Sequence, residues 1–367
     1  MITPHNDNKV REKIVSNGVK VDAALKIILK SIQPLDSEVV KLNSASSRVL
    51  AQDIHADSNI PRFDNSAMDG YAVKSEDTVG ASRARPKTLE VIADLKAGYV
   101  IKEILKKNQA IRIMTGAPVP KGADSVVMVE DTKTNSHQSG KESVEIHKQV
   151  KSGENVRTAG EDIKRGKLVF SRGLQLRPAH IGILASLGLT GVKVARKPYV
   201  AVLATGDEVV EVGRRLGPGK IRSSNSYTLL NQVSECGGIP KNLGIAGDNL
   251  RELKGKIRAG LGCDMLITSG GVSVGDYDLV KDALVQLGTN IHFWKVAMRP
   301  GKPLVFGAVK GIPVFGLPGN PVSSMVSFEV FVRPAILKML GQAADNEKVV
   351  DAVLEEDIKR KRILDIS

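Results

Sequence analysis

Cysteine is nearly absent from this chain of 367 residues, which has only Cys236 and Cys263. Their spacing matches neither a C-x-x-C redox motif nor a zinc site, so we expect two reduced, buried thiols rather than a disulfide. The six histidines are scattered without ligand-like spacing, which argues against a zinc enzyme. Aromatic residues make up only 4% of the chain, so its cores must consist mainly of aliphatic side chains.

Long hydrophobic runs are missing as well. The sequence has no stretch of about 18 apolar residues that could cross a membrane. Its first 21 residues are mostly polar and charged, unlike a signal peptide. We therefore expect a cytoplasmic protein without a membrane partner.

Charge is plentiful and unbalanced, with 53 Lys and Arg residues against 40 Asp and Glu residues and a formal net charge of +13. This excess favours anionic partners, such as a phosphorylated small molecule or an oxyanion. The lysines form no dense cluster and are not interleaved with aromatic residues, so a nucleic-acid partner is not expected.

The pattern of short apolar segments changes along the chain and predicts a multidomain α/β protein. Between Pro61 and about His147, five strand-like segments alternate with Gly and Pro, which predicts a β-rich inserted module with an exposed hairpin tip at Asn135–Lys141. From Tyr199 onward, apolar strands alternate with helices, which predicts a parallel-rich sheet with helices on both faces. The expected domains are a discontinuous linking domain (1–57 and 147–178), the β-rich insert (58–146) and a three-layer α/β domain (179–341).

Four predicted strands of the α/β domain end in short turns rich in small residues. The turns are T-G-D-E at 205–208, A-G-D at 246–248, S-G-G at 269–271 and P-G-N-P at 318–321. The carboxyl ends of parallel strands meet at one edge of a sheet, where such folds bind their ligands. The sequence therefore predicts a binding site at this edge.

The third turn is the most informative stretch of the chain. It begins the run T-S-G-G-V-S-V-G-D-Y-D, from Thr268 to Asp278, between an apolar strand and a predicted helix. A glycine-rich turn before a helix presents backbone N–H groups to an anion, and Ser269 and Ser273 add hydroxyl donors. Two carboxylates, Asp276 and Asp278, suit a hard cation such as Mg²⁺ beside a phosphate.

Several longer motifs, in the same order, resemble the molybdopterin molybdenumtransferase family, which includes the C-terminal domain of gephyrin. They are F-D-N-S-A-M-D-G-Y-A (63–72), I-M-T-G-A-P-V-P-K-G-A-D (113–124), R-T-A-G-E-D (157–162), the four turns, and F-W-K-V-A-M-R-P-G-K-P (293–303). The resemblance covers Val21 to Gly341. It implies an elongated homodimer that inserts molybdate into adenylyl-molybdopterin with release of AMP in a Mg²⁺-dependent reaction, in a cleft shared by two subunits.

The resemblance also assigns roles to individual residues. It implies catalytic functions for Asp69, Thr115, Glu208, Asp248, Asp278, Lys295 and Arg299, with Glu208 and Asp278 as ligands of Mg²⁺. It implies substrate contacts for Arg157, Asp162, Thr205, Gly206, Ser269, Gly270, Gly271, Ser273, Lys302, Pro318, Gly319 and Asn320. For Asp248 alone, an N-cap of the following helix is a competing interpretation. A molybdopterin adenylyltransferase is a possible partner protein.

Two features depart from the family pattern. Thr158 stands where a second basic residue is common, and residues 342–367 are too few for the family's C-terminal β-domain, so we expect only part of that domain. The short C-terminus keeps open a non-catalytic molybdopterin-binding scaffold. A molybdopterin adenylyltransferase also stays open, because it shares the motifs of the α/β domain, although it would not need the β-rich insert. The sequence does not distinguish molybdate from tungstate, because the two oxyanions have the same charge and shape.

Overall fold

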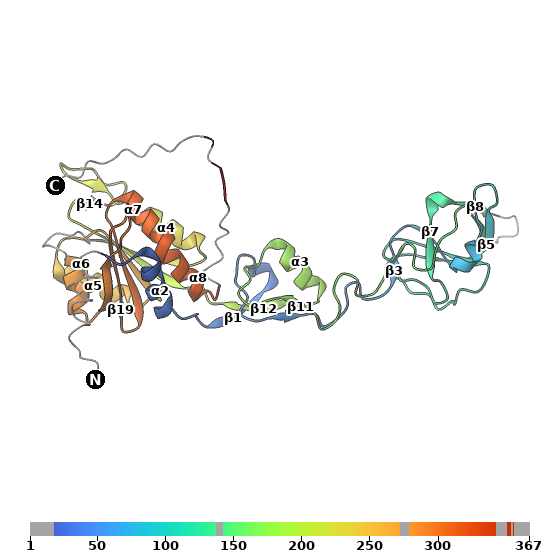
Figure 1. Ribbon diagram of the computed structural model, residues 1–367, viewed down its shortest axis with the longest axis horizontal. Helices are drawn as coiled ribbons and strands as arrows, with labels where there is room; N and C mark the ends of the chain where they lie inside the picture. The colour runs from blue at the N-terminus through green and yellow to red at the C-terminus, as the bar shows by residue number, and fades with distance from the viewer. Residues whose placement is uncertain (1–17, 137–141, 272–278, 343–350, 354, 356–367) are drawn as a thin grey trace. The chain divides into compact units, whose positions relative to one another are not determined.

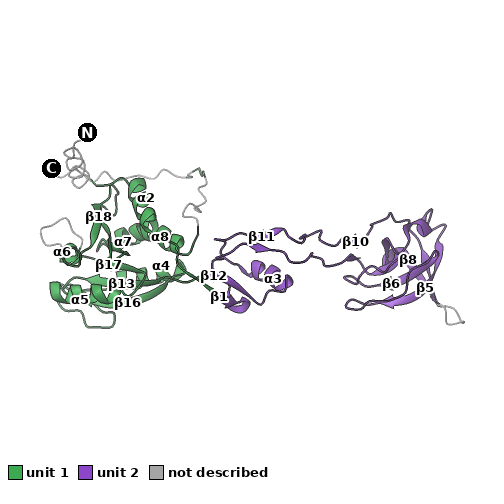
Figure 2. Cartoon of the chain, turned by 90° about the horizontal axis from the view of Figure 1, so that it is seen from below, with its two compact units in different colours: residues 1–38, 195–367 green, residues 39–194 purple. Residues whose placement is uncertain are grey.

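The computed structural model describes residues 18–136, 142–271, 279–342, 351–353 and 355 (Figure 1). The contacts divide the chain into two compact units (Figure 2). Unit 1 comprises residues 1–38 and 195–367, and unit 2 comprises residues 39–194. No helix in the described part of the chain is long and apolar enough to span a membrane.

Unit 1 is built on a six-stranded sheet with the order β16-β13-β17-β20-β19-β18. The first four strands are parallel, whereas β19 is antiparallel to both of its neighbours. The predicted parallel core is therefore confirmed, and the antiparallel pair β18–β19 is an addition that the sequence did not predict. The bounds are β13 Tyr199–Thr205, β16 Ile239–Ala246, β17 Met265–Ser269, β18 Asn290–Lys295, β19 Pro303–Val309 and β20 Ile312–Leu317.

Helices cover both faces of this sheet, as predicted for a three-layer domain (Figure 1). On one face, Ala201 and Leu203 of β13 share a buried core with side chains of α5 (Leu250–Gly260) and α6 (Leu279–Gln286). The other face is covered by α4 (Ser224–Glu235), α7 (Pro321–Ser327) and α8 (Arg333–Met339). The predicted helix at 322–340 is a continuous helical run in which a π-helical segment, Phe328–Val332, joins α7 to α8.

Unit 2 contains a second six-stranded sheet, with the order β7-β4-β6-β5-β9-β8. Both faces of this sheet are buried, because neighbouring residues of β4 lie in two different core clusters, Tyr71 in one and Ala72 in the other. All five predicted strands are present, and β8, which pairs with β9 around the predicted hairpin tip, was missed. The bounds are β4 Gly70–Val73, β5 Lys87–Leu95, β6 Gln109–Ile113, β7 Ser125–Met128, β8 Thr132–Ser136 and β9 Glu142–Ile146.

The rest of unit 2 consists of short strand pairs and one helix. Leu184 of helix α3 (Pro178–Ser186) is buried in a core with Leu50, Leu176 and Val194. The pairs are β1 (Ser37–Lys41) with β12 (Gly191–Ala195), β2 (Ile54–His55) with β11 (Leu168–Phe170) and β3 (Asn65–Ser66) with β10 (Val156–Arg157). Short helical turns lie at Leu42–Ser44, Ser75–Thr78 and Val129–Asp131.

These contacts differ from two of the predicted domain boundaries. Helix α2 (Val21–Ser31), expected in the linking domain, buries Ala24 and Ile28, contacts α8 and belongs to unit 1. Helix α3, expected at the start of the α/β domain, packs within unit 2 instead. In both cases the apolar face of a helix finds its partner far away in the sequence, which the local pattern does not reveal. The predicted partial C-terminal domain lies largely outside the described residues.

Candidate functional site at the carboxyl edge of the unit 1 sheet

The four predicted turns lie at one edge of the unit 1 sheet, which we call the carboxyl edge. In register, Ala204 of β13 lies opposite Ser269 of β17, and Ser269 lies opposite Leu317 of β20. On the other side of β13, Thr205 pairs with Ala246 at the end of β16. The four strands thus end at the same level, and the predicted convergence of their turns is confirmed.

The cationic segment after β18 reaches the same edge. Strand β19 runs opposite to β20, and Lys295, the last residue of β18, pairs with Pro303, the first residue of β19. The turn that contains Arg299 and Lys302 therefore lies beside the ends of the parallel strands. Among the described residues, none forms an ion pair or a side-chain hydrogen bond with Lys295, Arg299 or Lys302.

Glycine is required where the turns approach one another. A Cβ on Gly270 would lie 2.6 Å from the carbonyl oxygen of Thr205, and its φ of +95° disfavours other residues. A Cβ on Gly271 would lie 2.5 Å from Val280 Cγ2, and one on Gly319 would lie 3.6 Å from the Cα of Gly270. Gly270 and Gly271 are therefore needed for this turn to pack against Thr205 and Val280, whereas the distance at Gly319 is an ordinary van der Waals contact. The predicted contact residue Ser273 lies outside the described residues.

The two acidic turns are held together by a reciprocal contact. The backbone N–H of Asp248 donates to Asp207 Oδ1 at 2.9 Å, and the N–H of Asp207 faces Asp248 Oδ2 at 3.5 Å. Helix α5 is capped by Asn249, whose side chain accepts from the N–H groups of Arg251 and Glu252. Asp248 is thus not the helix cap, and its carboxylate points toward the neighbouring turn. Asp207 was not among the predicted site residues.

Glu208 supplies the other carboxylate of these turns. Its carboxylate lies over Gly206, since a Cβ on that glycine would stand 2.5 Å from Glu208 Oε2. Three carboxylates, from Asp207, Glu208 and Asp248, thus belong to adjacent turns, and oxygen donors of this kind suit Mg²⁺. In the described part of the chain, however, no three His, Cys, Asp or Glu side chains lie so that they could hold a metal ion together, and the predicted ligand Asp278 lies outside that part. The assignment of Mg²⁺ ligands therefore stays a prediction.

Asn225, near the start of α4, joins the S-G-G turn to the P-G-N-P turn. Its Nδ2 donates to Ser269 Oγ at 2.8 Å and to the carbonyl oxygen of Gly319 at 2.9 Å. Sequence reasoning missed this residue, although the polar run S-S-N-S at 223–226 before an apolar helix marks a helix start. Asn320 has a separate role: it caps α7 by accepting from the N–H of Ser323 at 3.2 Å.

Chemical groups are ordered across the carboxyl edge. The acidic turns follow β16 and β13, the glycine turns follow β17 and β20, and the cations flank β19 and β18. Neighbouring strands are about 4.8 Å apart, so the four steps from β13 to β18 separate the acidic from the cationic end by roughly 19 Å. A single ligand that contacts both ends must be extended.

In unit 2, two predicted residues from different motifs are in direct contact. Asp69 Oδ1 accepts from the backbone N–H and from the hydroxyl of Thr115, each at 2.7 Å. These two bonds, the backbone bond foremost, hold the pKa of the exposed Asp69 carboxyl below its usual value. Asp69 is therefore a fixed, ionised carboxylate on the surface of the β-rich module.

The R-T-A-G-E-D segment meets the same part of unit 2. Strand β10 pairs with β3, which places Arg157 opposite Asn65, and the Ala159 N–H donates to Asp64 at 2.7 Å. Arg157 binds Glu161 at 2.6 Å and Asp162 at 2.7 Å. Both predicted contact residues, Arg157 and Asp162, are thus engaged with each other in this structure.

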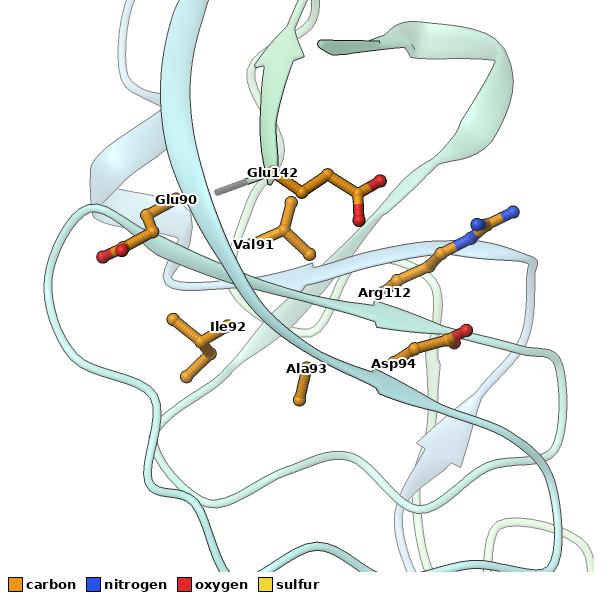
Figure 3. A pocket seen from close by; sticks show the side chains of 7 residues that line it. All are labelled: Glu90, Val91, Ile92, Ala93, Asp94, Arg112 and Glu142. Carbon is orange, nitrogen blue, oxygen red and sulfur yellow. The ribbon is translucent and has the colours of Figure 1, made fainter. Parts of the chain in front are cut away.

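A cavity of about 490 Å³ also opens on the unit 2 sheet (Figure 3). It lies at the β-bulge between Val91 and Ala93, where Asp94 is in register with Arg112. None of the predicted site residues lines it, and acidic side chains predominate among its charged groups, which does not suit an anionic substrate. Its lining residues are Glu90, Val91, Ile92, Ala93, Asp94, Arg112 and Glu142.

Comparison with known proteins also divides the chain near residue 190, although the N-terminal match includes α2, which belongs to unit 1. Residues 19–188 match the family model "MoeA N-terminal region (domain I and II)", and residues 201–338 match "Probable molybdopterin binding domain". A molybdopterin molybdenumtransferase from Bacillus subtilis is 38% identical over 343 residues, which cover 93% of this chain and 80% of the relative. The chain belongs to the molybdopterin molybdenumtransferase family.

Other relatives agree with this membership. A molybdopterin molybdenumtransferase from Nostoc is 42% identical over 88% of this chain and 74% of its own length. The crystal structure of a molybdopterin biosynthesis protein from Pyrococcus horikoshii superposes with a TM-score of 0.79 at 34% identity, covering 94% of this chain and 84% of that protein. The family expected from the motifs is thus confirmed, and with it the multidomain α/β fold.

Proposed function

We propose that this chain, a transferase of molybdenum cofactor biosynthesis by its family, inserts molybdate into adenylyl-molybdopterin and releases AMP. The observation that carries the proposal is the order of groups at the carboxyl edge. An extended substrate that joins a pterin to a nucleotide through a pyrophosphate can contact acidic, glycine-lined and cationic turns at once. A free oxyanion alone would need only the cationic turn.

The chain's own residues would divide the work. Lys295, Arg299 and Lys302 would attract and hold oxyanions, since they have no ion-pair partner among the described residues. Backbone groups of the glycine turns, with Ser269, would position the phosphate-bearing part of the substrate. Glu208, with Asp278 as predicted, would hold Mg²⁺, which when bound neutralises charge on the phosphate oxygens.

The proposal includes a homodimer, as the family resemblance implies, with a cytoplasmic location that suits two free, buried cysteines. Asp69 and Thr115 would then act on the substrate together with the carboxyl edge of another subunit. Of the alternatives, an adenylyltransferase would not need unit 2, whereas the family match extends through it. A non-catalytic scaffold would bind the substrate in the assay described below but would release no AMP.

The test is AMP release from adenylyl-molybdopterin by the purified protein, with Mg²⁺, in the presence and absence of molybdate. We expect release that depends on molybdate, and its loss by orders of magnitude in Glu208→Gln. Glu235→Gln is the matched control, because this exposed glutamate ends α4, away from the described turns. Binding of the substrate without any AMP release would favour the scaffold instead.

A further inference from the structure

The hydrogen bonds of Asn225 fix the orientation of its side-chain amide. The carbonyl oxygen of Gly319 can only accept, so the amide nitrogen, and not the amide oxygen, must face it at 2.9 Å. The second hydrogen on that nitrogen is then directed to Ser269 Oγ at 2.8 Å. Both donors of the Asn225 amide are thus used within the protein, one on each of two turns.

This arrangement determines what the Ser269 hydroxyl can do. Because its oxygen accepts from Asn225, its own proton is left to donate elsewhere. Ser269 is 4% exposed, and among the described residues no acceptor receives that proton. A buried donor without an acceptor is costly, so an acceptor supplied by a ligand would stabilise it. Ser269 is the last residue of β17, at the carboxyl edge where the parallel strands end and where such folds bind their ligands.

We propose that Asn225 is a positioning residue, which commits the Ser269 hydroxyl to donate a hydrogen bond to an anionic oxygen of the phosphate-bearing part of the substrate. The inference rests on the proposed function and deepens it. Asn225 does not touch the substrate in this account. It acts through Ser269, and by binding Gly319 it also fixes the distance between the two glycine turns.

Three variants separate this role from general stability. Asn225→Asp keeps the shape of the side chain but has no proton to donate, so Ser269 turns its own proton toward the introduced carboxylate and away from the substrate. Asn225→Ala removes the contact, and Ser269→Ala removes the donor. Asn231→Asp is the matched control, because Asn231 lies on the same helix, is exposed and, within the described residues, bonds only the carbonyl of Tyr227 through its side chain.

The measurement is equilibrium binding of adenylyl-molybdopterin without molybdate, so that no turnover is needed. We expect Asn225→Ala to weaken affinity roughly tenfold and Asn225→Asp to weaken it further. Asn231→Asp should stay within about twofold of the wild type. In the double variant Asn225→Ala, Ser269→Ala, the loss of affinity should be clearly smaller than the two single losses combined, because Asn225 acts mainly through Ser269 and only its bond to Gly319 is independent of it.

The outcomes distinguish this inference from the proposed function. Additive losses in the double variant, or wild-type affinity in Asn225→Asp, overturn the role of Asn225 even where AMP release is normal. Coupled losses in a protein that binds the substrate but releases no AMP support the role of Asn225 and overturn the transfer reaction. A wild-type protein that does not bind adenylyl-molybdopterin overturns both. Fluorescence of Trp294, the one tryptophan of the chain, reports whether unit 1 of each variant is folded.

Discussion

At the scale of single residues, the contact between Asp69 and Thr115 makes a prediction about pH. Two hydrogen bonds to the ionised carboxylate lower its pKa in the folded protein, so their stabilisation is present above the ordinary pKa of aspartate. It is lost as pH falls through the lower, folded-state value. Asp69 therefore stays ionised at every pH at which the enzyme is expected to work.

Replacing Thr115 tests this contact. Thr115→Val deletes the hydroxyl but keeps the backbone N–H, so the pKa of Asp69 should rise only part of the way toward its ordinary value. Thr115→Ser should leave it low. Carboxyl-carbon NMR titration measures both, and an unchanged pKa in Thr115→Val would show that the hydroxyl contributes nothing.

The sequence could not identify residues whose roles depend on which segments become neighbours in the folded protein. Motif reasoning predicted Asp69 and Thr115, which prove to be in contact although 46 positions separate them. It missed Asp207 and Asn225, whose roles depend on which turns become neighbours in space. It also left open whether Asp248 caps α5, and only the position of the Asn249 side chain answers that question.

At the scale of elements, close packing between strands makes Gly70 irreplaceable. A Cβ there would lie 1.9 Å from the backbone oxygen of Val127 on the neighbouring strand β7, and that backbone cannot move without breaking the pair. We expect Gly70→Ala to separate β4 from β7. The free energy of unfolding should then fall by more than the roughly 0.5 kcal/mol that is usual for a surface substitution. Hydrogen exchange of these two strands measures it.

Gly182 provides the matched control within the same unit. It lies in helix α3, where an added Cβ would meet nothing within 4 Å. Gly182→Ala should therefore stabilise the helix by up to about 1 kcal/mol, because alanine has the higher helix propensity. Equal protection of β4 in the two alanine variants would contradict the packing argument.

The start of the unit 1 sheet depends on an ion pair. Asp264 accepts from both ends of the Arg196 guanidinium, at 2.8 and 2.9 Å, and from the N–H of Tyr199 at 2.8 Å. Desolvation by burial raises the pKa of this carboxyl, but the bonds from Arg196 and Tyr199 outweigh it, so the net pKa is lowered. Its contribution is thus present above about pH 4, the ordinary pKa of aspartate, and fades at lower pH.

Asp264→Asn should accordingly destabilise unit 1 by roughly 1–2 kcal/mol at pH 7, a value reduced by the partial exposure of Arg196. Urea unfolding followed by Trp294 fluorescence measures it. The difference in free energy of unfolding between wild type and variant should narrow as the pH is lowered to 3. A gap that is the same at pH 7 and pH 3 would show that the charge of Asp264 does not matter.

The elements that could be predicted are those with a strong local pattern. Strand β13 is buried at every residue after Tyr199, and its apolar run is visible in the sequence. Strands β18 and β19 were missed because they flank a turn rich in Pro and Gly, and because their pairing is antiparallel in a sheet expected to be parallel. The family motif identified the cationic residues of that turn. Their position at the carboxyl edge could not be predicted without the order of strands in the sheet.

At the scale of the whole molecule, the net charge of +13 could act as a diffuse field or through particular contacts. The proposed site favours particular contacts, so neutralising Lys295 or Arg299 should weaken substrate affinity roughly ten- to a hundredfold. Neutralising Lys106 and Lys107, an exposed pair in unit 2, should change little beyond a salt-dependent association rate. If both sets of substitutions weaken substrate affinity equally, the positive charge acts only as a diffuse electrostatic field.

The proposed homodimer makes its own prediction. If Asp69 and Glu208 act on one substrate from different subunits, mixing Asp69→Ala with Glu208→Gln protein should restore part of the activity. One of the two clefts in such a mixed dimer carries neither change. A monomeric mass in solution, or no recovery after proven subunit exchange, would exclude the shared cleft.

The central claim is that one extended substrate lies along the carboxyl edge, with acidic and cationic turns acting at different ends. Single-turnover AMP release, measured as a function of molybdate concentration, tests it most directly. Glu208→Gln should lower the rate even at saturating molybdate, whereas Lys295→Met should raise the molybdate concentration needed for half-maximal rate. If both variants change the same quantity by the same factor, or if the wild type releases AMP equally well without molybdate, then the acidic and cationic turns do not act at different ends of one substrate.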